Sequence, residues 1–183
     1  MVGACAPPGL PNDVAVSGDL AYVTAGSGGL RIIDVSVPSS PIEVGFIGAA
    51  DSSRGVAVSG NHAYVADRDA GLRIIDVSDP TSPLEVGSYD TPGAAWGAAL
   101  SGKYAYVADL SALRAIDVSD PTSPAEVGFC ATAGDAYGVL VADQHVYLAD
   151  LDAGMEIFRD CAVFCFADGF ESGDTLAWSA TVP

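Results

Sequence analysis

The chain has 183 residues and a formal net charge of −17, from 24 acidic against 7 basic side chains. A surface this acidic repels polyanions, so nucleic acid and anionic lipid are excluded as natural partners. The sequence also contains no apolar run of about 18 residues, so we expect no membrane insertion by a helix.

One phrase recurs along the whole chain. Its copies begin at Val14, Val56, Ala98 and Val139, which gives spacings of 42, 42 and 41 residues. A fixed period near forty residues is typical of repeat architectures. We therefore divide the chain into a short leading segment, four units and a tail, with the bounds 1–13, 14–55, 56–97, 98–138, 139–160 and 161–183.

Within the unit 56–97, four short β-rich runs alternate with turns. The runs 56–58 and 62–65 flank a Gly-containing turn, which is typical of a hairpin. The run 72–77 ends at a turn whose two prolines exclude a central strand, and the run 84–89 follows. We name these strands A to D. They predict an all-β fold, a β-propeller built from four ~42-residue four-stranded repeats, either as four blades or as the C-terminal arc of a larger propeller.

Several side chains recur at fixed slots, and their positions favour structural roles. A tyrosine on strand B is expected to pack between neighbouring units. An aspartate at the end of strand C is expected to accept hydrogen bonds from the backbone of the following turn. A histidine after the A–B turn shares its slot with Leu and Tyr, which indicates packing or surface exposure. The residues are Tyr22, Tyr64, Tyr106 and Tyr147; Asp34, Asp76 and Asp117; and His62 and His145.

The blocks GLRIIDVS-P, SP-EVG and VSG--AYVAD resemble the LVIVD repeat family over about residues 14–158. The resemblance implies a propeller fold and a secreted or cell-surface protein of bacterial or archaeal type. It carries no catalytic motif that could be transferred to this chain.

The first nine residues align with 85–93, so the chain begins inside a strand D. In one interpretation, they supply the outer strand that the last unit lacks and so close a ring, which removes exposed edges. In the other, the chain is the end of a longer propeller, which also accounts for the absence of a signal peptide. Both interpretations predict a strand over residues 2–6.

The repeat pattern stops near Arg159, and residues 161–183 are expected to form a flexible or loosely docked tail. The four cysteines allow three complete pairings. Cys5 and Cys130 share a slot in different units and are expected to lie too far apart for a bond. If the ring closes, Cys161 or Cys165 could reach Cys5, and this is the disulfide that the sequence leaves open.

Turns B–C and D–A should lie at one end of the sheets, because antiparallel strands send successive turns to opposite ends. This end varies between units, whereas the other is monotonous. With strand A innermost, the slot before it should ring the mouth of a central channel and form a ligand-binding site. Its residues are Asn12, Arg54, Trp96 and Tyr137.

Three further aspartates, Asp67, Asp109 and Asp150, border the same end. Their oxygens suit calcium, but the D-x-D-x-D spacing of a calcium loop is missing. The cysteine spacing lacks the CxxC pair of a zinc site. We therefore predict no metal ligand and no cofactor.

Three functions are compatible with this pattern. The favoured one is a non-enzymatic, extracellular or cell-surface scaffold that binds a protein or a glycan. A propeller-type hydrolase or lactonase would need an axial cluster of His, Asp, Glu or a metal, and the slot before strand A offers none. A purely structural spacer within a longer surface protein is the third.

Overall fold

The structure is a computed structural model that describes residues 2–159. Over this range it consists of fourteen antiparallel β-strands. Two sheets have four strands each, in the orders β1-β2-β3-β4 and β5-β6-β7-β8, and the third has the order β14-β13-β12-β11-β10-β9. The strands are β1 Asp13–Ser17, β2 Leu20–Thr24, β3 Leu30–Asp34, β4 Ile42–Ile47, β5 Gly55–Ser59, β6 His62–Ala66, β7 Leu72–Asp76, β8 Leu84–Tyr89, β9 Gly97–Ser101, β10 Tyr104–Ala108, β11 Leu110–Asp117, β12 Ala125–Ala142, β13 His145–Asp150 and β14 Gly154–Arg159.

The third sheet has six strands because β12 serves two units. Its first part pairs with β11 as strand D of the third unit, and its last part pairs with β13 as strand A of the fourth. The sequence predicts a turn between these parts, but the structure has a continuous strand with a bulge between Ala136 and Gly138. The corresponding stretch of the second unit contains Pro92, which has no N–H to donate to a ladder. The first and third units both lack a proline there, and only the third continues the strand, so the absence of proline permits the continuous strand but does not by itself produce it.

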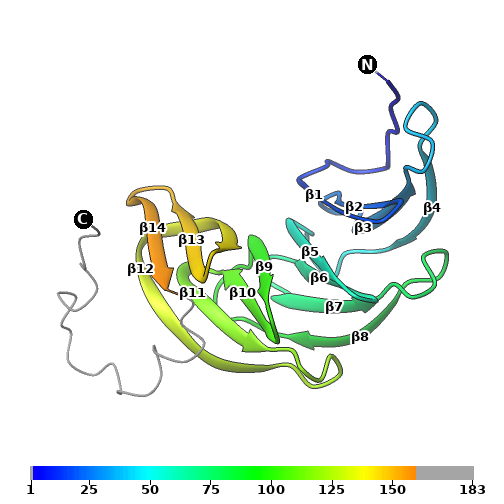
Figure 1. The fold of residues 1–183 in the computed structure, drawn as a ribbon. Coiled ribbons are helices and arrows are strands. Elements are labelled where there is room, and N and C mark those ends of the chain that lie inside the picture. Colours follow the sequence, from blue (N-terminus) through cyan, green and yellow to red (C-terminus); the bar gives the residue numbers. More distant parts are fainter. Residues whose placement is uncertain (1, 160–183) are drawn as a thin grey trace.

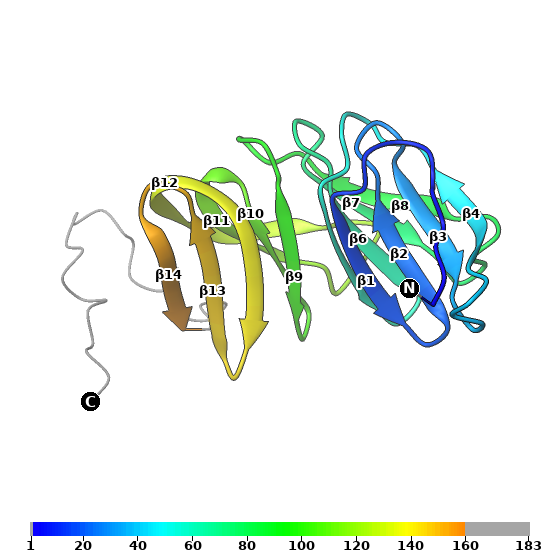
Figure 2. The ribbon, with the colours of Figure 1, turned by 90° about the horizontal axis from the view of Figure 1, so that it is seen from above.

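The sheets stand side by side along an arc (Figure 1), and the view from above shows β1 and β14 at opposite ends of it (Figure 2). Strand A of each unit lies innermost, as expected, because β1 contacts β5, β5 contacts β9 and β9 contacts β12. The all-β fold with four-stranded antiparallel repeats is thus confirmed.

The core lies between neighbouring sheets. Each repeated tyrosine of the first three units is buried and belongs to a cluster that joins its unit to the next one. Tyr22, for example, packs with Leu30 and Ile32 of its own sheet and with Val65 and Ile75 of the next. Burial of these side chains stabilises the stack by roughly 1.5–3 kcal/mol each.

The prediction of a strand over residues 2–6 is wrong, because the structure assigns none there. A strand needs a neighbour for its N–H and C=O groups, and no described strand pairs with this segment. Cys5 is exposed. Cys161, Cys165 and the predicted tail lie outside the described residues, so the predicted disulfide stays a prediction. No helix suited to crossing a membrane occurs between residues 2 and 159.

Candidate functional site

The residue just before strand A is held by the same backbone hydrogen bond in the first three units. Its N–H donates to the carbonyl of the last residue of strand B. These bonds run from Asn12 to Thr24, from Arg54 to Ala66 and from Trp96 to Ala108, and each measures 2.8 Å. The repeat therefore fixes the backbone of this residue at the inner edge of each sheet. The hydrogen bond involves only backbone atoms, so the side chain can differ from unit to unit.

The structure brings the four predicted site residues into one continuous row. Arg54 donates from Nη1 to Oδ1 of Asn12 over 3.1 Å. The same guanidinium lies 4.7 Å from the ring centroid of Trp96. The rings of Trp96 and Tyr137 follow, with centroids 4.4 Å apart and planes tilted by 49°. Four residues, each just before the strand A of one of the four units, thus touch in chain order.

Arg68 belongs to this row as well, and sequence reasoning left it out. Its guanidinium lies 5.8 Å from the ring of Trp96. Arg68 has a φ of 44°, in the left-handed region, where Gly26 of the first unit has 57°. Paired backbone hydrogen bonds of 3.0 Å with Ala95 hold it there. The sequence places Arg68 in the variable B–C turn, but only this bridge between turns shows that it meets Trp96.

The row is partly open to solvent and rich in donors. Asn12 is exposed, while Arg54, Trp96 and Tyr137 are half-buried. Within the described residues, three buried donor atoms of the row lack a hydrogen-bond partner, namely Nε of Arg54, Nε of Arg68 and Nε1 of Trp96. Such donors favour an acceptor ligand, because a buried polar group without a partner costs free energy.

The buried aspartates have a different role from the one considered for calcium. Asp67 and Asp109 are fully buried. Oδ2 of Asp67 accepts 2.7 Å from the backbone N–H of Ala50, in the preceding unit, and 2.9 Å from Nη1 of Arg73. Asp109 makes the same pair of contacts with Gly93 and Arg114. These carboxylates join neighbouring sheets, and residues 2–159 contain no cluster of three His, Cys, Asp or Glu suited to a metal.

The fourth unit breaks this pattern. Asp150 accepts 2.9 Å from the N–H of Gly134, as its counterparts do, but Glu156 stands in the slot of Arg73 and Arg114. Burial, and then the charge of Asp150, raises the pKa of Glu156, although a backbone hydrogen bond from Ala133 opposes this. The fourth unit thus replaces an ion pair with two acids.

The other end of the sheets carries the conserved-looking turns of the repeat. Asp76 accepts 2.8 Å from the N–H of Ser78, and this bond holds the pKa of Asp76 below its ordinary value. Asp34 and Asp117 do the same with Ser36 and Ser119. His62 lies with its ring centroid 6.5 Å from that of Tyr64, and His145 lies 6.3 Å from Tyr147. The geometry at this end is that of turns and surface packing.

This architecture, with strand A innermost and four antiparallel strands per repeat, defines a propeller-type repeat protein. The sequence model of the LVIVD repeat matches residues 8–47, 50–91 and 92–132. These three matches cover most of the chain, so the protein belongs to the LVIVD repeat family. No curated protein sequence matches it.

Solved structures match the fold at low sequence identity. The computationally designed Ika4 protein is similar with a TM-score of 0.68 and 11% identity, over 83% of this chain and 92% of that one. The periplasmic gluconolactonase of Pseudomonas aeruginosa has a TM-score of 0.68 and 14% identity, over 81% and 49%. The β-propeller domain of Cps50 (Swd1) from Myceliophteria thermophila has 0.63 and 14%, over 80% and 50%. The chain thus spans about half the length of the last two.

Proposed function

We propose that this protein is a non-enzymatic, secreted or cell-surface scaffold that binds a protein or a glycan at the row Asn12–Arg54–Trp96–Tyr137. The observation that carries the proposal is the continuity of this row. Four side chains, one before each strand A, occupy a slot where the repeat imposes no residue type, and they touch one another at the inner edge of the arc.

The chemistry of the row suits recognition. Trp, Tyr and Arg are the side chains that dominate binding energy in interfaces, because each buries a large area and still offers a polar group. Arg54 and Arg68 both face Trp96, although the chain carries only 7 basic residues. Nε of Arg68 also lies 4.0 Å from Oδ2 of Asp51. The two positive charges and the Nε atoms without a hydrogen-bond partner favour a ligand with carboxylates or hydroxyl oxygens, as in an acidic peptide segment or a glycan.

Secretion or display at a cell surface is supported by the resemblance of the repeats to a family of such proteins and by the acidic composition. A net charge of −17 favours solubility and disfavours polyanions as partners.

A propeller-type hydrolase is the second candidate, since one matched structure is a gluconolactonase. At 14% identity that likeness concerns the fold alone. The row with Arg68 offers two guanidinium groups, an indole, a phenol and an amide, and none of these five side chains is an acid or a histidine that could act as acid and base. A structural spacer within a longer surface protein is the third candidate.

The test is a screen of the full chain on glycan and surface-protein arrays, repeated with Arg54→Ala/Trp96→Ala. We expect specific binding that the double substitution lowers at least tenfold. Lys103→Ala is the control, because Lys103 lies in an A–B turn at the opposite end of the sheets. Binding that survives the double substitution would remove the row as the site. Absence of any binding would favour the spacer, and turnover in a hydrolase panel with calcium would favour the enzyme.

A further inference from the structure

The two ends of the arc expose the two halves of one repeated interface. Between neighbouring sheets, strand A residues such as Val56 pack against the preceding sheet, and Val56 is 5% exposed. Its counterpart on β1, Val14, is 58% exposed, and Val16 is 66% exposed. These valines face the position that the inner strands of a preceding blade would take, and the described residues leave them exposed.

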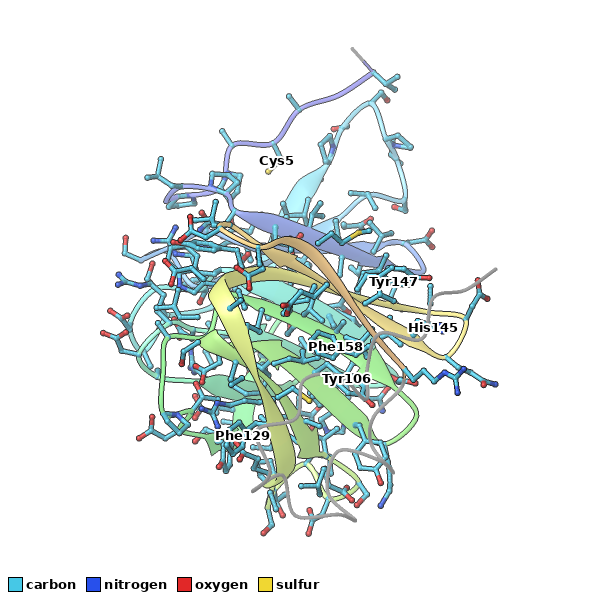
Figure 3. The ribbon with its side chains drawn as sticks, turned by 90° about the vertical axis from the view of Figure 1, so that its left-hand side faces the viewer. Cys5, Tyr106, Phe129, His145, Tyr147 and Phe158 are labelled. Carbon is cyan, nitrogen blue, oxygen red and sulfur yellow. The ribbon has the colours of Figure 1, made fainter. Side chains whose placement is uncertain are left out.

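The β14 end shows the complementary half. Leu72 and Ile74 of strand C are fully buried against the next sheet. Their counterparts on β14, Met155 and Ile157, are 65% and 54% exposed. Figure 3 looks onto this end, where β13 carries the labelled Tyr147, the fourth member of the tyrosine slot. Met155 and Ile157 therefore expose apolar side chains at slots that are buried inside the arc.

Residues 2–6 already lie where the outer strand of a preceding blade would lie. A Cβ added to Gly45 of β4 would come 2.0 Å from the carbonyl oxygen of Pro80 in the next unit, and Gly87 of β8 stands in the same relation to Pro121 at 2.2 Å. Gly3 repeats this contact with Pro38, also at 2.2 Å. The leading segment thus docks as a strand D does, but it has no strand C beside it.

Among residues 2–159, no matching element lies beside β14. In the first three units strand C pairs with a strand D, whereas among the described residues β14 pairs with β13 alone. Within the part of the chain that the structure describes, one end of the arc therefore has a strand D segment without its sheet, and the other end has a sheet without a strand D.

We propose that two copies of this chain associate head to tail into one closed ring. The β1 face of each copy packs on the β13–β14 face of the other, and residues 2–6 of each copy pair with β14 of the other as its fourth strand. A two-fold axis makes both junctions identical and leaves no open sheet edge. The apolar junctions repeat the interfaces found inside the arc, and the chain spans about half of two matched structures.

Other occupants would compete for the same faces, and further repeats of a longer chain, on the β1 side, are one of them. Residues 160–183 could cover the β14 end, or the leading segment of the same chain could close the ring alone. Such closure by one chain requires contact between β1 and β14, which lie at opposite ends of the arc in both views (Figures 1 and 2).

The first experiment measures the mass of the full chain in solution by light scattering over a range of concentrations. A dimer has twice the chain mass of 18.5 kDa, or 37.0 kDa. We expect this dimer, and more of it at higher salt, because two chains of charge −17 repel each other. Val16→Arg and Ile157→Arg should each give a folded monomer, with β-structure confirmed by circular dichroism. Leu84→Arg changes an exposed apolar residue of β8 away from the junctions and should leave the dimer intact.

The second experiment tests the register. Strand C pairs with strand D through Leu30 and Ile47 in the first unit and through Leu72 and Tyr89 in the second. Met155 occupies the strand C slot of Leu30 and Leu72, and Cys5 occupies the strand D slot of Ile47 and Tyr89. Met155→Cys should therefore form a disulfide with Cys5 of the other copy on mild oxidation, since paired strands bring Cα atoms within reach of such a bond. The product is a covalent dimer on a non-reducing gel, and it should be absent in Met155→Cys/Cys5→Ser. A monomeric chain at all concentrations, or a bond within one chain, would overturn the proposal.

Discussion

Arg54 holds its guanidinium carbon 4.7 Å from the ring centroid of Trp96, the residue that occupies the same slot in the following unit. Each of them donates its backbone N–H to the last carbonyl of the strand B that follows it. The contact is therefore a consequence of the repeat, because the period of the sequence places the two side chains side by side.

The contact between Arg54 and Trp96 should contribute measurably to stability. A partly exposed cation–π pair contributes about 0.5–1 kcal/mol. We expect a double-mutant cycle with Arg54→Ala and Trp96→Ala, read out by urea unfolding, to give a coupling energy of this size. Arg54→Ala combined with Tyr104→Ala, at the other end of the sheets, should be additive within roughly 0.5 kcal/mol. Equal coupling in both cycles would contradict the contact.

The buried pair of Asp109 and Arg114 should be far more sensitive than a surface pair. Asp109 is fully buried, and Arg114 also donates to Oε2 of Glu126 over 2.9 Å. Asp109→Asn removes one of the two negative charges beside the buried guanidinium of Arg114. The substitution should lower the free energy of unfolding by about 3–5 kcal/mol. Lys103→Ala, which breaks an exposed ion pair with Asp117, should cost less than about 1 kcal/mol. Chemical denaturation of both variants measures the difference.

Glu156 should make the protein gain stability as the pH falls. Its pKa in the folded state lies above the ordinary value of 4.5, chiefly through burial and then through the charge of Asp150. Between the ordinary value and the raised one, the folded state binds more protons than the unfolded state, so stability falls as the pH rises through this window. Glu156→Gln removes this titration.

The measurement is the free energy of unfolding of the native chain and of Glu156→Gln, followed from neutral pH downwards. The advantage of the variant at neutral pH should shrink as the pH falls through the raised pKa towards 4.5. A difference that does not change with pH would show that Glu156 has an ordinary environment in the folded chain.

The glycines of strand D should tolerate no side chain. A Cβ on Gly87 would come 2.2 Å from the carbonyl oxygen of Pro121, and backbone must move to accommodate it. We expect Gly87→Ala to destabilise the protein by about 1–3 kcal/mol, as overpacking does. Gly48→Ala is the control, because no atom lies within 4 Å of its added Cβ. Thermal unfolding of the two variants should separate them, and similar values would argue against tight docking of strand D on the next unit.

Much of the fold follows from the sequence itself. The period of the repeat, the turn residues and the β-rich runs predicted four strands per unit, and the row Asn12, Arg54, Trp96 and Tyr137 followed from comparing units. Local chemistry suffices here, since glycine and proline end strands wherever they occur and equivalent positions of a stacked repeat become neighbours. The position before strand A could therefore be identified from the sequence alone.

The tertiary structure decided the rest. It joined strand D of the third unit to strand A of the fourth as β12, left residues 2–6 without a strand partner, and brought Arg68 to Trp96 through a left-handed turn. It also showed that Asp67 and Asp109, whose oxygens were considered for calcium, are buried ion-pair partners of Arg73 and Arg114. Each of these outcomes depends on which side chains and backbone groups come into contact between neighbouring units. The residue pattern along the sequence does not specify the hydrogen bonds made between units.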